Sequence, residues 1–580
     1  MTGATTEIGS PALERPRVAW GEVLRWGFVA VIVLAVLGPI VMVVLAGVNV
    51  APALQGFRFG LGHWAQALSA PEAESALWNT VTIVGIRGLL GFAIAVPIAW
   101  LIARTNMPGR DALEFGFWIA FFMPSLAYIQ SWAFLLEGYN GLINQWLRGV
   151  PLLSSLNFDV YSYWGIIWVH LLSHNVSILV VMLVLAFRNM DSSLEEVARI
   201  SGASKWKTLI DVILPLSRPM IAMLVILAII KGMQSYEVEA ILGQPAGVDV
   251  YSTLVVRMLT DEPPRIAQGA VLSSVILIAL LPLIVFQRLY VGARQYTTIS
   301  SKMRMTQIDL GPVKRWMAFC IVGLLVLMQT AVPFFSLIAG SLMVRWGYFS
   351  IPSPWTLDKW KLVLSNEQFL DCLFNTLGIG VLAGVGAALI CFIVAYILVR
   401  SPFWGRGVLE FVSWLPWAIP GVLLSLGLVA VVIGIPFLRP LYGTMFILAV
   451  AVILFRFPLS VHLLKTGLMQ VNQELEEAST ICGSDKLTTQ WRINVPILMP
   501  MLIAVGLMTF VTAVNEVSGV VLLASADLRT LSLLSLDYIM GGRPQKEAAA
   551  VVTIVMLVLC VGVALIARGF GIRLGAASDK

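Results

Sequence analysis

Long apolar stretches recur along the whole chain and restrict what it can fold into more than any other feature. Each is about 20 residues long or longer, which is what an α-helix needs to cross the hydrocarbon core of a bilayer. The predicted spans cover residues 26–48, 77–103, 113–137, 162–186, 217–240, 267–292, 316–343, 373–399, 408–434, 442–466, 498–523 and 549–568. The sequence therefore predicts an all-α integral membrane protein with about 12 transmembrane helices.

The composition excludes an ordinary soluble domain. Only 12% of the 580 residues are charged and 59% are hydrophobic, whereas soluble domains carry about 25% charged residues. The net charge of +6 is typical of the Lys/Arg bias of cytoplasmic loops and does not indicate nucleic-acid binding. The five cysteines form no C-x-x-C pair, so we expect neither a disulfide framework nor a cysteine metal site.

The basic loops predict the orientation of the chain in the membrane. Lys and Arg are concentrated in the N-terminal arm, the 104–110 turn, the 188–218 loop and the 294–315 linker. Such residues favour the cytoplasmic side, so both termini are expected there, as an even number of spans requires. The stretch 26–48 is too long for the apolar part of a signal peptide, and we expect it to be a retained span.

The second half of the chain repeats the first. Residues 98–115 read IAWLIARTNMPGRDALEF and residues 394–411 read VAYILVRSPFWGRGVLEF, which align at an offset of 296. Later in each half the offset falls to 281, so the first copy carries 15 more residues, which we place in its outward loop near 139–160. Each half holds an even number of spans, which predicts two parallel six-helix repeats with a pathway between them.

These patterns divide the chain into five parts. We expect a cytoplasmic N-terminal arm over 1–25, a first repeat over 26–293 with its core at 77–293, a cytoplasmic linker over 294–315, a second repeat over 316–568 with its core at 373–568, and a cytoplasmic tail over 569–580.

A long polar loop lies between the fourth and fifth spans of each half, at 190–216 and 471–497. Residues 194–220 read LEEVARISGASKWKTLIDVILPLSRPM and residues 475–501 read LEEASTICGSDKLTTQWRINVPILMPM, without a gap between them. An acidic start favours a helix N-terminus, the central glycine permits a sharp turn, and the prolines suit a chain re-entering the bilayer. We predict a bent pair of short helices on the membrane surface. Ser192 and Glu195 fit a capping box, and Gln473 replaces the serine in the second copy, where Asn472 or the backbone beside it is expected to take its place.

These loops resemble the EAA loop of type-1, MetI-like permeases of binding-protein-dependent ABC importers, whose pattern is E-A-A-x3-G-x9-I-x-L-P. The pattern falls on Glu196, Val197, Ala198, Gly202, Val212, Leu214 and Pro215 in the first copy, and on Glu477, Ala478, Ser479, Gly483, Ile493, Val495 and Pro496 in the second. The departures from the pattern are small apolar or near-isosteric exchanges, and the resemblance covers both halves.

The resemblance implies that each loop is a coupling helix that docks in a groove of an ATP-binding subunit. The implied coupling residues are Glu195, Glu196, Gly202, Pro215, Glu476, Glu477, Gly483 and Pro496. The implied partners are two copies of an ABC ATPase subunit and one periplasmic or lipid-anchored substrate-binding protein, at the bacterial cytoplasmic (inner) membrane. The chain lacks GxxxxGK[ST], so we expect a non-catalytic subunit without a cofactor, with ATP bound by the partner.

Ionisable residues within the predicted spans are candidates for a translocation pathway. They are Lys231, Glu237, Glu239, Arg456 and Glu516. At about 1.5 Å per helical residue, Lys231 is expected near the middle of the bilayer and the three carboxylates near its outer face. One hypothesis is that these carboxylates receive a cationic substrate. The alternative is that they pair with one another or with loop charges.

His170 and His174 lie four residues apart, a spacing compatible with a metal site. No third ligand stands nearby in the sequence, so helix-to-helix hydrogen bonding is favoured and no metal site is predicted.

Within this family, the chain looks most like the fused two-half permeases for ferric iron. The similarity lies in two segments after the fifth spans, EVEAILGQPAGVDVYSTLV and LLASADLRTLSLLSLDYI. The resemblance implies ferric iron as the substrate, with thiamine, phosphonate or polyamine as alternatives. A secondary transporter driven by an ion gradient is a remoter alternative, against which the duplicated loop argues.

Overall fold

The computed structural model describes residues 20–51, 57–188, 197–198, 200–292, 308–401 and 403–569. Within these ranges the chain forms helices and three isolated β-bridges, without a strand. In the same ranges, nine helices are long and apolar enough to cross a membrane, and three bent helix pairs raise this number to as many as 12. The predicted all-α membrane fold is confirmed.

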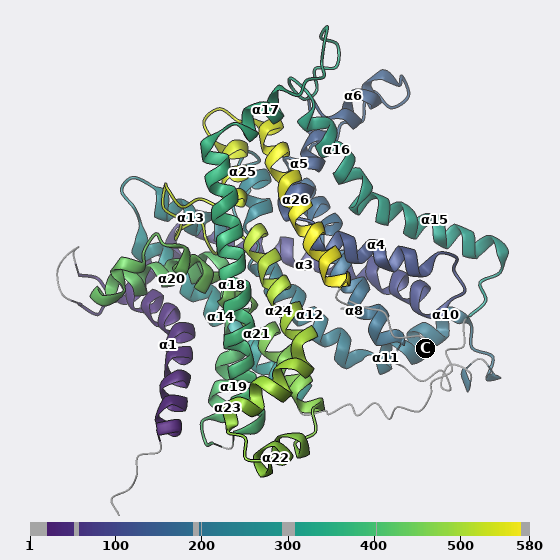
Figure 1. Ribbon diagram of the computed structural model, residues 1–580. Helices are drawn as coiled ribbons and strands as arrows, with labels where there is room; N and C mark the ends of the chain where they lie inside the picture. The colour runs from purple at the N-terminus through teal and green to yellow at the C-terminus, as the bar shows by residue number, and fades with distance from the viewer. Residues whose placement is uncertain are drawn as a thin grey trace, which may run out of the picture.

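The helices follow the same order in the two repeats (Figure 1). The first repeat contains α1 (Trp20–Val48), α2 (Gly62–Ser69), α3 (Pro71–Arg104), α4 (Arg110–Phe122), α5 (Ser125–Leu136), α6 (Leu142–Gly149), α7 (Tyr163–His170), η1 (Leu171–Asn175), α8 (Val176–Arg188), α10 (Lys205–Thr208), η2 (Leu209–Ile213), α11 (Leu214–Leu216), α12 (Arg218–Met233), η3 (Glu239–Gly243), α13 (Tyr251–Thr260) and α14 (Ile266–Gly292). The second contains α15 (Pro312–Gln329), α16 (Ala331–Ser341), α17 (Asp358–Leu364), α18 (Glu367–Arg400), α19 (Arg406–Trp414), η4 (Leu415–Ala418), α20 (Gly421–Gly434), η5 (Pro436–Leu441), α21 (Met445–Gln470), α22 (Glu474–Ile481), α23 (Lys486–Thr489), η6 (Gln490–Asn494), α24 (Val495–Asn515), α25 (Leu531–Met540) and α26 (Lys546–Gly569).

Equivalent hydrogen bonds hold the two repeats in the same fold. Thr80 Oγ1 on α3 accepts a bond of 3.0 Å from the N–H of Tyr251, at the start of α13. At the equivalent place, Thr376 Oγ1 on α18 accepts a bond of 2.9 Å from the N–H of Leu531, at the start of α25. In each repeat this bond fastens the segment after the fifth span to the second span.

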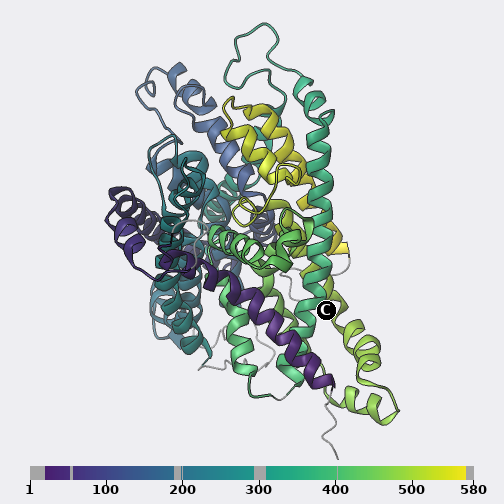
Figure 2. The same cartoon turned by 90° about the vertical axis from the view of Figure 1, so that its left-hand side faces the viewer.

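The first span of each repeat packs against the other repeat. α1 contacts α14 of its own repeat and α20 of the second, and Figure 2 shows it running along the outside of the bundle beside α20. α16 likewise packs on α26 of its own repeat and on α5 of the first repeat. The α1–α20 approach is close, because a Cβ on Gly427 would lie 2.5 Å from the carbonyl oxygen of Pro39. The repeats are therefore interlocked at both ends.

Two predicted spans, 113–137 and 408–434, are broken rather than continuous. α4 and α5 meet at 99°, and the helices on either side of Pro420 meet at 116°. Pro124 and Pro420, which are equivalent at the offset of 296, precede the first residues of α5 and α20. Proline lacks an N–H and clashes with the preceding turn, so the helix stops there and a new one begins in another direction.

The fifth spans end earlier than predicted. We expected helices over 217–240 and 498–523, but α12 ends at Met233 and α24 at Asn515. In the first repeat the chain then forms the short η3 turn, whose residues are buried. Glu237, Glu239 and Glu516 therefore lie beyond the ends of α12 and α24, so their depth does not follow from helical rise and stays a prediction.

The additional residues of the first repeat lie in the connection after α5. That connection covers 137–162 and contains α6, whereas the equivalent connection covers 435–444 and contains η5. Figure 1 places α6 at the opposite end of the molecule from α22. Of the predicted 294–315 linker, the described part pairs Ile308 with Thr105 in a parallel bridge, and α15 begins at Pro312.

Candidate functional site

Glycine ends the first short helix of each duplicated loop. Gly202 has φ +82° and Gly483 has φ +87°, a backbone conformation that glycine adopts without strain. The N–H of Ala203 donates to the carbonyl of Ala198 (2.9 Å), and the N–H of Ser484 donates equivalently to Ser479 (3.1 Å). This 6→1 bond after a left-handed residue is the Schellman pattern of a helix C-terminus.

The helix that follows each glycine has its own side-chain cap. Ser204 Oγ accepts from the N–H of Lys207 (3.2 Å), and Asp485 Oδ1 accepts from the N–H of Thr488 (3.2 Å). The Thr488 hydroxyl also bonds this carboxylate, and the two bonds lower the pKa of Asp485. Sequence reasoning missed these caps, although a Ser or Asp just before a short helix is the signal that would have found them.

Glutamates of the second loop have different roles. Glu476 Oε1 accepts from Arg400 Nε at the end of α18 (2.8 Å), and both side chains are largely buried. Glu477 is exposed. The start of α22 is capped by Asn472, whose Oδ1 accepts from the N–H of Glu474 (3.2 Å). Glu476 therefore fastens the loop to a span, whereas the Glu477 side chain is exposed.

Two of the four other residues predicted to couple to the ATPase, the prolines, lie within the described ranges. Glu195 and Glu196 lie outside the described residues. Pro215 is the second residue of α11 and Pro496 the second residue of α24, each directly after a π-helical turn.

Each loop presents an exposed isoleucine at the same position. Ile200 is 88% exposed and Ile481 is 87% exposed, and they are equivalent at the offset of 281. Val197 in the first loop and Leu487 and Trp491 in the second are also more than half exposed. Exposed apolar side chains therefore recur in both loops, a feature typical of surfaces that contact another protein.

Lys231, Glu237, Arg456 and Glu516 gather where the two repeats meet, and we call them the interface cluster. Lys231 lies within Coulombic range of Arg456 and Glu516 in the other repeat. Gln234 accepts from Lys231 Nζ (3.1 Å) and donates to the carbonyl of Trp417, also in the other repeat (2.5 Å). The cluster therefore combines two cations and two carboxylates, one of each from each repeat.

Both carboxylates of the interface cluster have polar groups close by. Glu516 Oε1 accepts from Ser518 Oγ (2.7 Å) and from the N–H of Gly519 (2.9 Å). Glu237 lies close to the Ser125 hydroxyl at the start of α5 and to the N–H of Val517 across the interface. Glu237 thus links the two repeats at the end of the fifth spans.

Glu239 belongs to a separate buried triad. Its Oε1 lies 2.7 Å from His170 Nε2, and its Oε2 accepts from the Ser235 hydroxyl (2.6 Å). Arg87 Nη1 lies 2.9 Å from His170 Nδ1. Arginine only donates, so Nδ1 accepts and the proton on Nε2 is donated to Glu239. The second repeat has Ala383, Ala451 and Val520 at the equivalent positions.

The two histidines point to different partners. His174 Nε2 lies 2.9 Å from the carbonyl of Met123, and His170 is engaged in the triad. A break at Ser173 in η1, where ψ is −137°, separates them. In the part of the chain that the structure describes, no three His, Cys, Asp or Glu side chains come together as a metal site would require.

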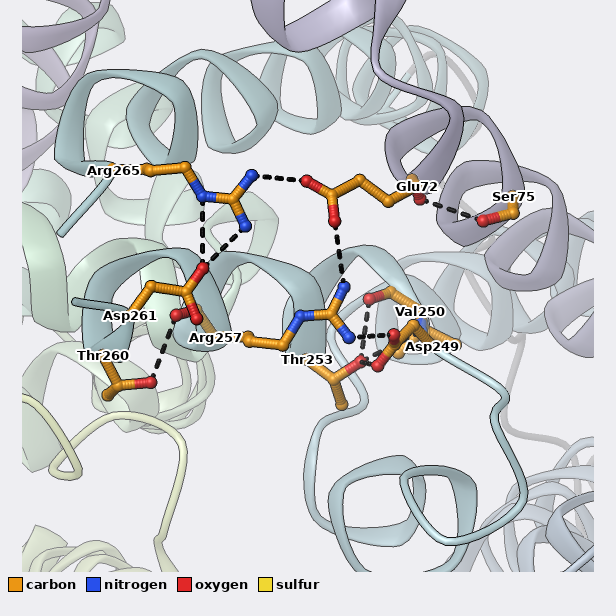
Figure 3. A network of polar contacts seen from close by, with 9 residues as sticks. All are labelled: Glu72, Ser75, Asp249, Val250, Thr253, Arg257, Thr260, Asp261 and Arg265. Atoms are coloured by element: carbon orange, nitrogen blue, oxygen red, sulfur yellow. Dashed lines mark hydrogen bonds and ion pairs between the residues drawn. The ribbon is translucent and has the colours of Figure 1, made fainter. Parts of the chain in front are cut away.

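A charged network stiffens the segment after η3 (Figure 3). Glu72 on α3 lies between Arg257 (3.3 Å) and Arg265 (2.5 Å). Arg257 also pairs with Asp249, and Asp261 pairs with Arg265 (2.6 Å) and raises its pKa. The second repeat contains the Asp249–Arg257 pair with its charges exchanged, as Arg529 and Asp537. Both repeats therefore have an ion pair at this place, with the acidic and basic residues exchanged.

Two segments of the chain, 95–293 and 378–574, match the family described as binding-protein-dependent transport system inner membrane component. Together they cover more than half of the sequence. The chain belongs to this family. Each matched segment contains one duplicated loop and half of the interface cluster, whereas α1, α15 and α16 lie outside both.

Individual relatives in this family include permeases named for iron. The chain is 27% identical over 364 residues to the ferric transport system permease protein FbpB of Actinobacillus pleuropneumoniae, covering 62% of this chain and 51% of that protein. It is 27% identical over 406 residues to the putative ferric transport system permease protein FbpB 1 of Haemophilus influenzae, covering 68% and 62%. It is 25% identical over 558 residues to the probable ABC transporter permease protein y4fN of Sinorhizobium fredii, covering 92% and 94%. The matches to the two ferric relatives thus span only about half to three fifths of their length. The many apolar helices and this family make the chain a multi-pass inner membrane protein.

Proposed function

We propose that this chain is the membrane-spanning, non-catalytic permease subunit of a binding-protein-dependent ABC importer. The observation that carries this proposal is the duplicated loop: two helix–glycine–helix turns of matching geometry, each with an exposed isoleucine. Each loop docks one ATPase subunit, so one chain assembles with two. A substrate-binding protein delivers the cargo at the opposite face.

The arrangement of the chain supports this orientation. Figure 1 shows α22 and the start of α1 at one end of the molecule, and α6 and α17 at the other. Arg25 lies near the start of α1, and Lys and Arg beside a span favour the cytoplasmic side. Both termini and both ATPase sites are therefore assigned to the cytoplasm.

The docking assignment is tested by placing a charge on each isoleucine. Ile200→Glu and Ile481→Glu should each remove one ATPase subunit from the complex purified through the permease, because a charge in an apolar contact is costly to desolvate. Leu152→Glu is the matched control: Leu152 is 89% exposed but lies in the connection after α5, at the other end. Retention of both ATPase subunits by the double isoleucine variant would contradict the proposal.

Ferric iron is the proposed cargo, supported by the names of two relatives. The test is uptake of radiolabelled ferric iron by proteoliposomes that contain the permease, its ATPase and its binding protein. ATP-dependent iron accumulation is expected. Accumulation of thiamine, a phosphonate or a polyamine instead of iron would refute the iron assignment and leave the importer assignment intact.

A further inference from the structure

The two cations of the interface cluster have fewer polar partners for their hydrogen-bonding capacity than Glu516 has. Lys231 Nζ bonds only the neutral Gln234 amide, and Arg456 Nε bonds only the Thr512 hydroxyl, among the residues that the structure describes. An ammonium has three donors and a guanidinium has five, so most of their capacity is unused. Within the same described ranges, neither cation forms an ion pair with a carboxylate, although Glu516 is in Coulombic range of both.

Both cations lie well inside predicted membrane spans. Lys231 is 13 residues after the start of α12 and Arg456 is 11 residues after the start of α21, or about 20 Å and about 16 Å along their helices. The hydrocarbon core is about 30 Å thick. The Lys231 side chain is nevertheless exposed rather than packed among apolar groups. Charged groups at such depth are costly and mark pathways for polar solutes.

The fold does not require either cation. At the offset of 281, Lys231 is equivalent to Thr512 and Arg456 is equivalent to Asn175. In each repeat the position that is charged in the other is neutral, and both neutral residues make hydrogen bonds within the fold. The two charges converge because each repeat contributes its cation from a different helix.

The carboxylates are poor candidates for holding a cationic cargo. Glu516 accepts hydrogen bonds from Ser518 and Gly519, Glu237 lies close to polar groups of Ser125 and Val517, and Glu239 is buried in the triad with His170. Their lone pairs are partly used, whereas the donors of Lys231 and Arg456 are available. This reverses the hypothesis that acidic groups receive a cation at the outer mouth.

We propose that Lys231 and Arg456 together bind an anionic group of the cargo in the middle of the pathway. The group is an oxyanion such as a phosphate or a carboxylate, which accepts several charge-assisted hydrogen bonds at once. It arrives either as a free anion or as a ligand of a metal ion. This inference rests on the proposed importer function and adds the class of group that the pathway recognises.

The test replaces each cation by the neutral residue found at the equivalent position of the other repeat, which the fold is expected to tolerate. Lys231→Thr with Arg456→Asn gives each position the residue of the other repeat. Purified full-length chain in lipid nanodiscs is titrated with inorganic phosphate, citrate and ferric citrate, and its thermal unfolding is recorded. We expect the wild type to bind at least one of the three, and the double variant to bind it about tenfold or more weakly, with unchanged unfolding, because charge-assisted bonds are lost. Arg456→Lys should retain part of the affinity.

Two further variants complete the test. Lys314→Gln removes a charge from an exposed lysine at the start of α15 and should bind as the wild type does. Glu516→Ser, the residue of the first repeat, should bind the anion as tightly or more tightly, because a nearby negative charge is removed. If the double variant fails to fold, the single variants Lys231→Thr and Arg456→Asn decide by the same titration.

The outcomes separate the sources and the hypotheses. Binding of phosphate or citrate alone indicates a free anion, and binding of ferric citrate only indicates a metal ion with its anionic ligand. A wild type that binds none of the three, a double variant that binds normally, or loss of binding only in Glu516→Ser would overturn the proposal. Co-purification of the ATPase is measured on the same samples, so failure of the importer function is recognised separately.

Discussion

Among single residues, the left-handed glycines of the duplicated loops, Gly202 and Gly483, are the ones at which a substitution should have the clearest effect. A Cβ on Gly483 would meet no atom within 4 Å, so Gly483→Ala adds backbone strain without a clash. The left-handed conformation costs a residue with a Cβ roughly 1–2 kcal/mol. We expect faster amide hydrogen exchange in α22 and reduced ATP-driven uptake.

The control for that substitution is Gly483→Asn, because asparagine adopts the left-handed conformation more readily than alanine. It should restore most of the protection of α22. Equal exchange rates in wild type and Gly483→Ala would show that the glycine conformation is not what stabilises the loop. Gly202→Ala should behave in the same way, since its Cβ would also meet open space.

The Arg87–His170–Glu239 triad gives a second prediction at this scale. His170→Ala leaves two buried charged groups without their common partner, which costs about 3–5 kcal/mol. Replacing the triad by its counterparts in the second repeat, as Arg87→Ala, His170→Ala and Glu239→Val, removes the charges together. The triple variant should therefore unfold at a higher temperature than the single variant in detergent. A triple variant that is less stable than His170→Ala would contradict this account.

At the scale of elements, the packing of α1 on the second repeat can be tested at a single glycine. Gly427 on α20 lies against Pro39 of α1, and a larger side chain there would push the helices apart. Overpacking of this kind costs typically 1–3 kcal/mol, so Gly427→Val should lower the thermal unfolding temperature. Gly27→Val on α1 is the matched control, because its Cβ would meet nothing within 4 Å. Equal destabilisation by both variants would argue against the contact.

How far the sequence predicts these elements depends on whether the signal is local. Apolar length predicted the membrane helices, and the repeat predicted their correspondence. The ends of α12 and the breaks before α5 and α20 were not predicted, because apolar residues continue past them. Pro124 and Pro420 are equivalent at the offset of 296, but the direction that the chain takes after each depends on the packing of distant segments.

At the scale of the whole molecule, a pseudo-symmetric scaffold carries an asymmetric interior. The duplicated loops could be found from sequence because identical residues recur at one offset. The interface cluster could not be found from the repeat. Lys231 and Arg456 lie on non-equivalent helices and are 225 positions apart in the sequence. The sequence identified both as ionisable residues within predicted spans, but it did not show that they lie close to one another. The burial of Glu239 could not be predicted from the sequence either, because it depends on the turn that the chain makes after α12.

The proposed complex contains one permease chain and two ATPase subunits, which dock on its two duplicated loops. Native mass spectrometry of the complex purified through the permease measures this directly. The account predicts one permease with two ATPase subunits for the wild type, and one with a single ATPase subunit for Ile200→Glu or Ile481→Glu. A wild-type permease that retains no ATPase subunit, or the same mass for wild type and both variants, would contradict it.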